Sequence, residues 1–177
     1  MGKLQCKNLK ISVYLNKYIN IENVKAKNFC LTEKRTLYNL KFNQCSVTIY
    51  KHTENKVLHV TGIRNRINAL TVLKFLSSIF GEIDNYVIDN SLFSCKNKKK
   101  INLQNIVKLQ IENYSTTYLE EVFSALFLKP HKKLKELGCP TILIFSNSSY
   151  VIIGAKNLAN VQNADMLVKN IFKNVHQ

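Results

Sequence analysis

Apolar and polar residues alternate along several short segments of this chain, which is the pattern of β-strands with one buried face. In the segment 7–14, Leu9, Ile11 and Val13 would share one face, with polar residues between them on the other. Three later segments alternate in a similar way, and a polar stretch separates the last two. The first half therefore predicts strands at 7–14, 37–42, 45–51 and 56–62, with a loop at 52–55.

Two other segments of the first half show helical spacing. Residues 20–30 predict a short helix with Ile21 and Val24 facing inward. Between Arg64 and Phe80, apolar residues recur every three or four positions, and Gly81 follows as a stop signal. This second segment is long enough to cover one face of a small sheet.

The second half predicts the same order of elements again. A strand is followed by a helix, a basic segment, two strands and a final amphipathic helix, for which Asn157 is the expected N-cap. The predicted elements are a strand at 103–111, a helix at 117–128, strands at 141–146 and 149–154, and a helix from about 158 to 174.

Two stretches of the chain resemble each other, which indicates an internal duplication. They are SVTIYKHTENKVLHVTGIRN at 46–65 and TILIFSNSSYVIIGAKN at 141–157, and an amphipathic run follows each. The predicted organisation is α+β, with one repeat over residues 1–81, a linker over 82–102 and a second repeat over 103–177.

The hairpin at 141–154 has two apolar faces. Leu143, Phe145 and Val151 would share one face, while Ile144 and Ile152 share the other. One face must cover the protein's own core, and the second needs another partner. One alternative is a sandwich or a dimer interface; the other is an open sheet that lies on a wide surface of low polarity, such as a DNA minor groove.

The charge favours a polyanionic partner. The chain carries 26 lysines and arginines against 11 acidic residues, a formal net charge of +15. Only three of these residues are arginine, so bidentate reading of guanine is not the main theme. An AT-rich genome is an alternative source of the lysines, but it does not explain the deficit of acidic residues.

Several function classes are disfavoured by the sequence. It has no apolar run of 18 residues for a membrane span and no apolar signal core. The five cysteines are scattered without metal-ligand spacing, which is typical of reduced thiols inside a cell. No acid–base constellation is visible, and nothing pairs with His59 at hydrolase or metal spacing. We therefore expect a protein that is not an enzyme and needs no cofactor.

Several motifs, in the right order, resemble the conserved core of the TATA-box-binding protein family. The segment LIFSNSSYVIIGAKN looks like the family's LIF-x-SGK-x-V-x-TGAK hairpin. LQNIV is similar to the QN-[IM]-V strand that opens the family's second repeat, and LE to the RLEGL opening of that repeat's first helix. The first half resembles the family's LQNIV…ALRARN segment and its V-V-T-G. These stretches lie at 143–157, 103–107, 119–120, 4–28 and 59–62.

The resemblance implies a fold and a function. The fold would be a saddle of two pseudo-symmetric repeats, each a curved antiparallel sheet with two helices on the convex face. The concave sheet would clamp and bend the minor groove of double-stranded, AT-rich promoter DNA. Transcription factors or RNA polymerase subunits would bind the convex face, with no membrane involved.

The resemblance also assigns roles to residues. The family kinks DNA with phenylalanine wedges, and Phe145 occupies one such position, with Phe127 or Leu128 as its expected partner. In the first repeat, Tyr50 takes the hairpin position and the other wedge falls on Thr36 or Leu37.

Of the two asparagines at the groove centre, Asn105 fits one, while Cys6 replaces the other. The groove-floor positions correspond to Leu143, Val107, Val151 and Ile153 in the second repeat, and to Thr48, Asn8, His59 and Thr61 in the first.

The first-repeat face would thus be polar and the second apolar. Lys10, Lys41, Lys51 and Lys56 are candidates for phosphate contacts, although each is more commonly a solubilising residue. The lysine run at 96–100 predicts either a solvated loop or an arm that contacts phosphates.

Two departures from the family bear on partners. The loop after the second repeat's first helix, which in the family binds transcription factor IIB, is expected to be about ten residues shorter. The connection at 82–102 is expected to be about twelve residues longer. These differences predict a divergent transcription initiation factor, from a large DNA virus or another AT-rich genome, acting in a nucleus or a cytoplasmic viral factory. The alternative is a protein-interaction module of the same fold that has lost most DNA binding.

Overall fold

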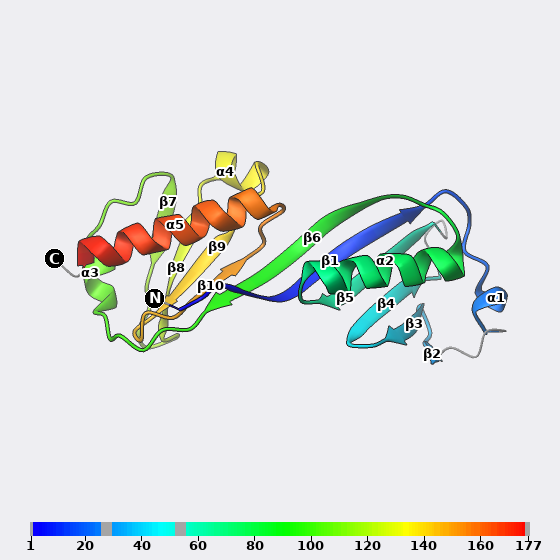
Figure 1. Ribbon diagram of the computed structural model, residues 1–177. Coiled ribbons are helices and arrows are strands. Elements are labelled where there is room, and N and C mark those ends of the chain that lie inside the picture. Colours follow the sequence, from blue (N-terminus) through cyan, green and yellow to red (C-terminus); the bar gives the residue numbers. More distant parts are fainter. Residues whose placement is uncertain (1, 26–29, 52–55, 176–177) are drawn as a thin grey trace. The chain divides into compact units, whose positions relative to one another are not determined.

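The computed structural model describes residues 2–25, 30–51 and 56–175 (Figure 1). Two compact units are present. The N-terminal unit spans residues 7–89, and the C-terminal unit combines residues 2–6 with residues 90–175. Among the described helices, none has the length and apolarity that a bilayer crossing requires.

The N-terminal unit is an antiparallel sheet with helix α2 on one face (Figure 1). Its strands follow the order β2-β3-β4-β5-β1, with the first part of β6 beyond β1. Its elements are β1 (Gln5–Leu15), α1 (Ile21–Lys25), β2 (Leu31–Glu33), β3 (Leu37–Phe42), β4 (Cys45–Tyr50), β5 (Val57–Ile63), α2 (Arg66–Phe80) and β6 (Ile83–Cys95), of which β1 and β6 also contribute to the C-terminal unit.

Local sequence sets the ends of α2. The Asn65 side chain accepts a hydrogen bond from the backbone N–H of Asn68, which is an N-cap. Gly81 ends the helix with φ of 92°, and its N–H bonds to the carbonyl of Ser77. Between these ends, Val72 and Leu76 are buried against the sheet. The core-facing strand residues include Ile11, Val13, Leu40, Val47, Ile49, Leu58 and Val60.

The C-terminal unit is built in the same way around helix α5, which runs over β8, β9 and β10 in Figure 1. From the second part of β6, the strand order is β6-β10-β9-β8-β7. The further elements of this unit are α3 (Leu103–Val107), β7 (Tyr114–Thr117), β8 (Ala125–Pro130), α4 (Lys132–Glu136), β9 (Thr141–Phe145), β10 (Tyr150–Ile153) and α5 (Leu158–Val175).

The core of this unit lies between the sheet and α5. Tyr150 is fully buried there and packs edge to face against Phe172 of α5. Its hydroxyl donates a hydrogen bond to Asp165, whose other carboxylate oxygen pairs with Lys169 at 2.6 Å. A buried phenol thus has the hydrogen-bond partner that its burial requires. The strand residues that share this core include Leu126, Leu128, Ile142, Ile144 and Ile152.

The two units share one order of elements. Each runs strand, short helix, four strands and long helix, and α4 is an addition between β8 and β9. The strand neighbours also correspond, since β2-β3-β4-β5-β1 matches β7-β8-β9-β10-β6. The second series begins with β6 at Ile83, so most of the segment 82–102 expected to be a linker is a strand.

Most elements with a strong pattern are where the sequence predicts them. In the first half, β1, β3, β4, β5 and α2 confirm the predictions, and α1 covers the start of the predicted helix at 20–30. In the second half, β9, β10 and α5 agree, and the Asn157 side chain caps α5 by accepting from the N–H of Asn160. The predicted loop at 52–55 and the end of the first predicted helix lie outside the described residues.

Two predictions for the second half were wrong. Residues 103–107 form helix α3 instead of a strand, because Leu103 and Ile106 are buried one helical turn apart and the Asn102 side chain caps the helix at Gln104. The helix predicted over 117–128 is a loop followed by β8. Its apolar residues Leu119 and Val122 have exposed fractions of 61% and 78%, so helical spacing there does not mark a buried face.

Candidate nucleic-acid interface

Each sheet has one face toward its long helix and an opposite face, which we call the open face of that unit. In the C-terminal unit, strand alternation buries Ile142 and Ile144 toward α5 and turns Leu143 and Phe145 to the open face. The cross-strand partners continue both faces. The C-terminal open face consists of Leu92, Ser94, Phe127, Leu143, Phe145, Val151 and Ile153, all of them partly exposed.

An aromatic cluster lies at one end of this open face. Phe123, in the loop before β8, has an exposed fraction of 43%. Its ring centroid is 5.4 Å from that of Phe127 and 6.4 Å from that of Phe145. The wedge partner expected from the sequence was Phe127 or Leu128, but Leu128 is fully buried on the helix side. Phe123 was missed because the segment was interpreted as a helix.

The N-terminal open face is polar. On β4 and β5, Thr48 and His59 face each other across the strands, as do Ser46 and Thr61. The Ser46 hydroxyl donates to the Asn39 side chain at 2.8 Å. We define the N-terminal open face by Lys10, Ser12, Tyr14, Leu37, Asn39, Lys41, Ser46, Thr48, Tyr50, Val57, His59 and Thr61. The predicted contrast between a polar and an apolar face is therefore present in the structure.

His59 has partners that the sequence did not reveal. The buried hydroxyl of Ser12 donates to Asp89 at 2.7 Å, and His59 Nδ1 lies 3.0 Å from the same Ser12 oxygen. Because the hydroxyl proton is directed to Asp89, the imidazole is the donor in its contact with Ser12. The Tyr50 ring packs against the imidazole edge to face, with centroids 5.3 Å apart. This order differs from a nucleophile–base–acid chain, since the carboxylate, and not the imidazole, accepts the serine proton.

Two asparagines lie at matching positions in the two units. Asn8 on β1 accepts a hydrogen bond from the N–H of Gly62, which follows the body of β5 with φ of 92°. Asn90 on β6 lies beside Gly154, which follows β10 with φ of 90°. Strand alternation turns both asparagines to the open face, in line with Leu92 and away from the buried Ser91.

These positions replace two assignments made from the sequence. Asn105 and Val107 lie on α3, whose buried residues join the cluster under α5, so the structure does not bring them to the open face. Cys6 was assigned to the second asparagine position, which Asn8 fills. The signal that could have identified Asn90 is the alternation of DNSLFSC at 89–95, which the linker interpretation obscured.

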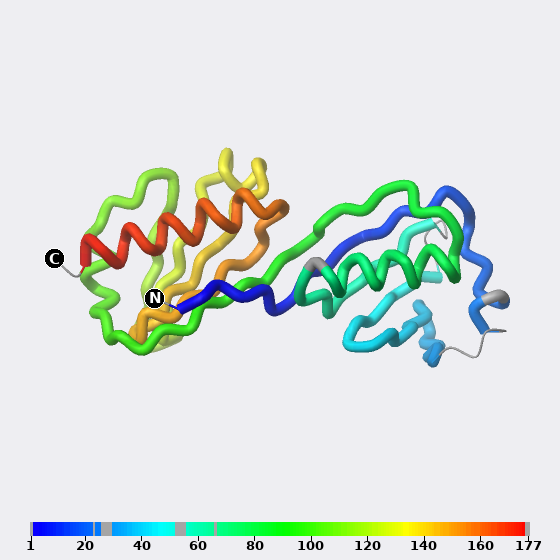
Figure 2. The backbone as a smooth tube through the Cα atoms, in the orientation of Figure 1, coloured from blue at the N-terminus to red at the C-terminus, as the bar shows by residue number. Residues whose placement is uncertain are grey.

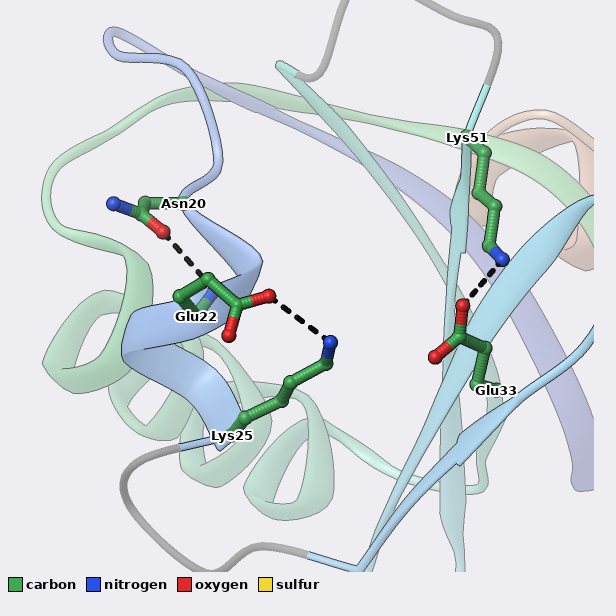
Figure 3. Close-up of polar contacts among 5 residues, drawn as sticks. All are labelled: Asn20, Glu22, Lys25, Glu33 and Lys51. Carbon is green, nitrogen blue, oxygen red and sulfur yellow. Dashed lines mark hydrogen bonds and ion pairs between the residues drawn. The ribbon is translucent and has the colours of Figure 1, made fainter.

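Several lysines of the N-terminal unit are paired with carboxylates (Figure 3). Lys51 lies 2.6 Å from Glu33, and this hydrogen bond lowers the pKa of the Glu33 carboxyl. Lys25 lies 3.0 Å from Glu22, and this bond raises the pKa of the lysine. Lys51 was a candidate for a phosphate contact, but its ammonium group already has a carboxylate partner.

The other candidates differ in their surroundings. Lys56 lies over the ring of Tyr18, with its nitrogen 4.5 Å from the centroid. Lys10 and Lys41 are on the N-terminal open face, and within the described part of the chain neither has an ion-pair partner. They remain the lysines of this face that are free to meet phosphates.

Comparisons with known proteins agree with this geometry. A family model described as "Transcription factor TFIID (or TATA-binding protein, TBP)" matches residues 85–176, which is just over half of the chain. The chain belongs to the TATA-binding protein family. The match begins within β6, as the structure requires for the second series of elements, and not at residue 103.

A solved structure extends the likeness of this TATA-binding protein relative to both units. Methanococcus jannaschii TBP is similar with a TM-score of 0.74 and 18% sequence identity, over 98% of this chain and 99% of that chain. At this identity the likeness establishes the fold. No curated protein sequence matches the chain. The shared fold and the family match make this protein a TBP-like transcription factor.

Proposed function

We propose that this protein is a transcription initiation factor that binds the minor groove of AT-rich duplex DNA with its open faces. The observation that carries the proposal is the exposed pair of Phe123 and Phe145 at the end of an apolar open face. Minor-groove proteins insert such apolar side chains between base steps and kink the duplex. A groove floor with few hydrogen-bonding groups also suits Leu143, Val151 and Ile153.

The two units would contribute differently as pseudo-symmetric repeats. In the C-terminal unit, Ala125 pairs with Phe145, and Phe123 precedes Ala125 by two residues. In the N-terminal unit, Leu37 pairs with Tyr50, and the residue two positions earlier is the exposed Arg35. The N-terminal end would therefore present a tyrosine and a cation, and it would anchor phosphates more than it wedges base steps. Asn8 and Asn90 are the asparagines we assign to the groove centre.

In this proposal the protein acts inside the cell without catalysis, and transcription factors or polymerase subunits bind its helix-covered faces. The test is binding of AT-rich and GC-rich duplexes of equal length, measured by fluorescence anisotropy across a salt series. We expect tighter binding to the AT-rich duplex at every salt concentration, with log affinity falling linearly with log salt. Equal affinity for both duplexes would contradict the minor-groove proposal.

A second candidate function is a protein-interaction module of the same fold. The N-terminal open face favours it, because the Ser12, His59 and Asp89 cluster presents hydrogen-bonding groups and a carboxylate where a groove floor would offer little in return. Absence of duplex binding by a folded wild-type protein, together with capture of a transcription protein that Thr48→Lys abolishes, would favour this candidate.

A further inference from the structure

The lysine-rich segment after β6 is fixed to the C-terminal unit by hydrogen bonds. The backbone N–H of Asn97 donates to the hydroxyl oxygen of Ser149 at 2.9 Å, and its side-chain amide donates to the carbonyl of Ser148 at 2.9 Å. Farther along, the N–H of Ile101 donates to the carbonyl of Ser146 at 2.8 Å. Residues 98–100 therefore form a short arch, held at both ends by the turn between β9 and β10.

The first residues of the chain pass beside the same arch (Figure 2). The Gly2 N–H donates to the Asn97 side-chain oxygen at 2.6 Å, and the Gly2 carbonyl accepts from the thiol of Cys95 at 3.1 Å. A Cβ atom at Gly2 would overlap the carbonyl oxygen of Lys96, so this close approach requires glycine. The interpretation of the lysine run as a plain solvated linker does not fit a segment held at this many points.

A hollow of about 640 Å³ lies between the arch and the end of α5. Phe172, which is buried, provides an apolar floor, and lysines surround it. Of these, Lys169 pairs with Asp165 at 2.6 Å, whereas in the part of the chain that the structure describes no carboxylate pairs with the others. The four unpaired lysines that line the hollow are Lys96, Lys98, Lys99 and Lys173.

We propose that this hollow binds an acidic peptide segment with an apolar anchor residue, presented by a protein partner. Positive charge around an apolar floor is complementary to carboxylates on either side of a leucine or phenylalanine. Lysine ammonium groups on flexible stems suit such a rim, because they can follow carboxylates in several arrangements. The fixed arch reduces the ordering cost of binding.

The position of the hollow favours a peptide over nucleic acid. Lys169, Phe172 and Lys173 come from α5, which covers the helix side of the sheet, whereas duplex DNA is proposed on the open face. A separate hollow of about 690 Å³ lies beside Phe145 and Val151, and Lys96 and Lys98 line both hollows. Lys99 and Lys173 line the one beside α5 and not the other. They are therefore the residues that distinguish the two ligands.

The experiment uses a short fluorescein-labelled peptide in which aspartate and glutamate alternate with leucine and phenylalanine, titrated with full-length protein at ~0.1 M salt without DNA. We expect saturable binding that Lys99→Glu with Lys173→Glu weakens by about tenfold. The matched control is Lys132→Glu with Lys133→Glu on α4, which has the same change in net charge on exposed residues outside the hollow, and it should change affinity less than twofold.

A second measurement does not depend on how the variants fold. In wild-type protein, the peptide should shift the amide resonances of Asn97 and Ser148 and leave those of α4 in place. Equal weakening by both double variants, or no saturable binding, would overturn the proposal. So would loss of duplex affinity in the Lys99 and Lys173 variant with unchanged peptide affinity, which would assign these lysines to DNA. Because no DNA is present in the titration, failure here would leave the minor-groove proposal untouched.

Discussion

The rings of Phe123 and Phe145 meet edge to face, with centroids 6.4 Å apart and an interplanar angle of 61°. One ring comes from the loop before β8 and the other from the end of β9. Both belong to the C-terminal unit, and both have part of their surface exposed. Two adjacent aromatic rings at a sheet end form a wedge that could enter a base step.

Phe123→Ala and Phe145→Ala should each weaken binding to an AT-rich duplex by more than ~1 kcal/mol, since both rings would contact the opened base step. Fluorescence anisotropy measures the change. Val122→Ala is the matched control, because Val122 precedes Phe123 in the same loop and is 78% exposed. Unchanged affinity in both phenylalanine variants would exclude the pair as a wedge.

Bending should depend more on the C-terminal unit than on the N-terminal unit. Tyr50 packs against His59 within a polar face, whereas Phe145 lies in an apolar one. Tyr50→Ala should therefore reduce the bend less than Phe145→Ala does, because an apolar ring loses less solvation when it enters a base step. Energy transfer between dyes at the two duplex ends measures the bend, and the reverse ranking would refute the asymmetry.

The salt dependence of duplex binding should separate the lysines of the arch. Lys96 and Lys98 line the hollow beside Phe145, so changing both to glutamine should lower the slope of log affinity against log salt by about 1 to 2. Lys99→Gln with Lys100→Gln should leave the slope unchanged, because each lost phosphate contact changes it by roughly 0.9. Equal slopes for wild type and both double variants would mean that the arch makes no phosphate contact.

Two glycines with the same φ of 92° should differ in their tolerance of alanine. At Gly81 a Cβ meets open space, so Gly81→Ala should cost about 1 kcal/mol of unfolding free energy, from backbone strain alone. At Gly62 a Cβ would overlap the carbonyl oxygen of Gln44, and Gly62→Ala should cost at least ~2 kcal/mol. Urea unfolding followed by circular dichroism measures both, and equal losses would contradict the close contact at Gly62.

Alkaline pH should destabilise the C-terminal unit through Tyr150. Burial, and then the hydrogen bond to Asp165, raises the pKa of the Tyr150 phenol. A raised folded-state pKa contributes stability that is fully present below the unfolded value of about 10 and is lost as pH rises above it. Burial also raises the pKa of Tyr114 to about 12, which adds to the loss between these values.

Tyr150→Phe should therefore flatten the decline of stability above pH ~10, at the cost of one hydrogen bond at neutral pH. Tyr86→Phe, at a 54% exposed position, is the control and should follow wild type. Thermal unfolding monitored by circular dichroism across alkaline pH gives the comparison. A Tyr150 variant with the wild-type pH profile would show that this phenol does not set the alkaline limit.

The sequence predicted the hairpins and long helices because their signals are local. Strict alternation placed Leu143 and Phe145 opposite Ile142 and Ile144, and one side-chain cap with one glycine defined α2. The polar character of the N-terminal open face also followed from alternation, since Thr48 lies between two buried residues on β4.

The rest depended on relations that a single segment does not contain. LQNIV has apolar residues at both strand and helix spacing, and only the core under α5 makes Leu103 and Ile106 the buried pair of a helix. β6 has exposed apolar residues at Tyr86 and Val87, which hid its strand pattern. The partners of His59 come from β1 and β6, so no spacing along the chain announces them.

The composition of the C-terminal unit has a consequence for folding during synthesis. This unit takes residues 2–6 from the start of the chain and residues 90–175 from its end, while residues 7–89 form the other unit. Chains emerge from the ribosome N-terminal end first, so the N-terminal unit can collapse once β6 has been made. The first residues must wait, unpaired, until the hairpin of β9 and β10 arrives to receive them. The last step of maturation is thus a long-range closure between the oldest and the youngest parts of the polypeptide, and such closures are slow.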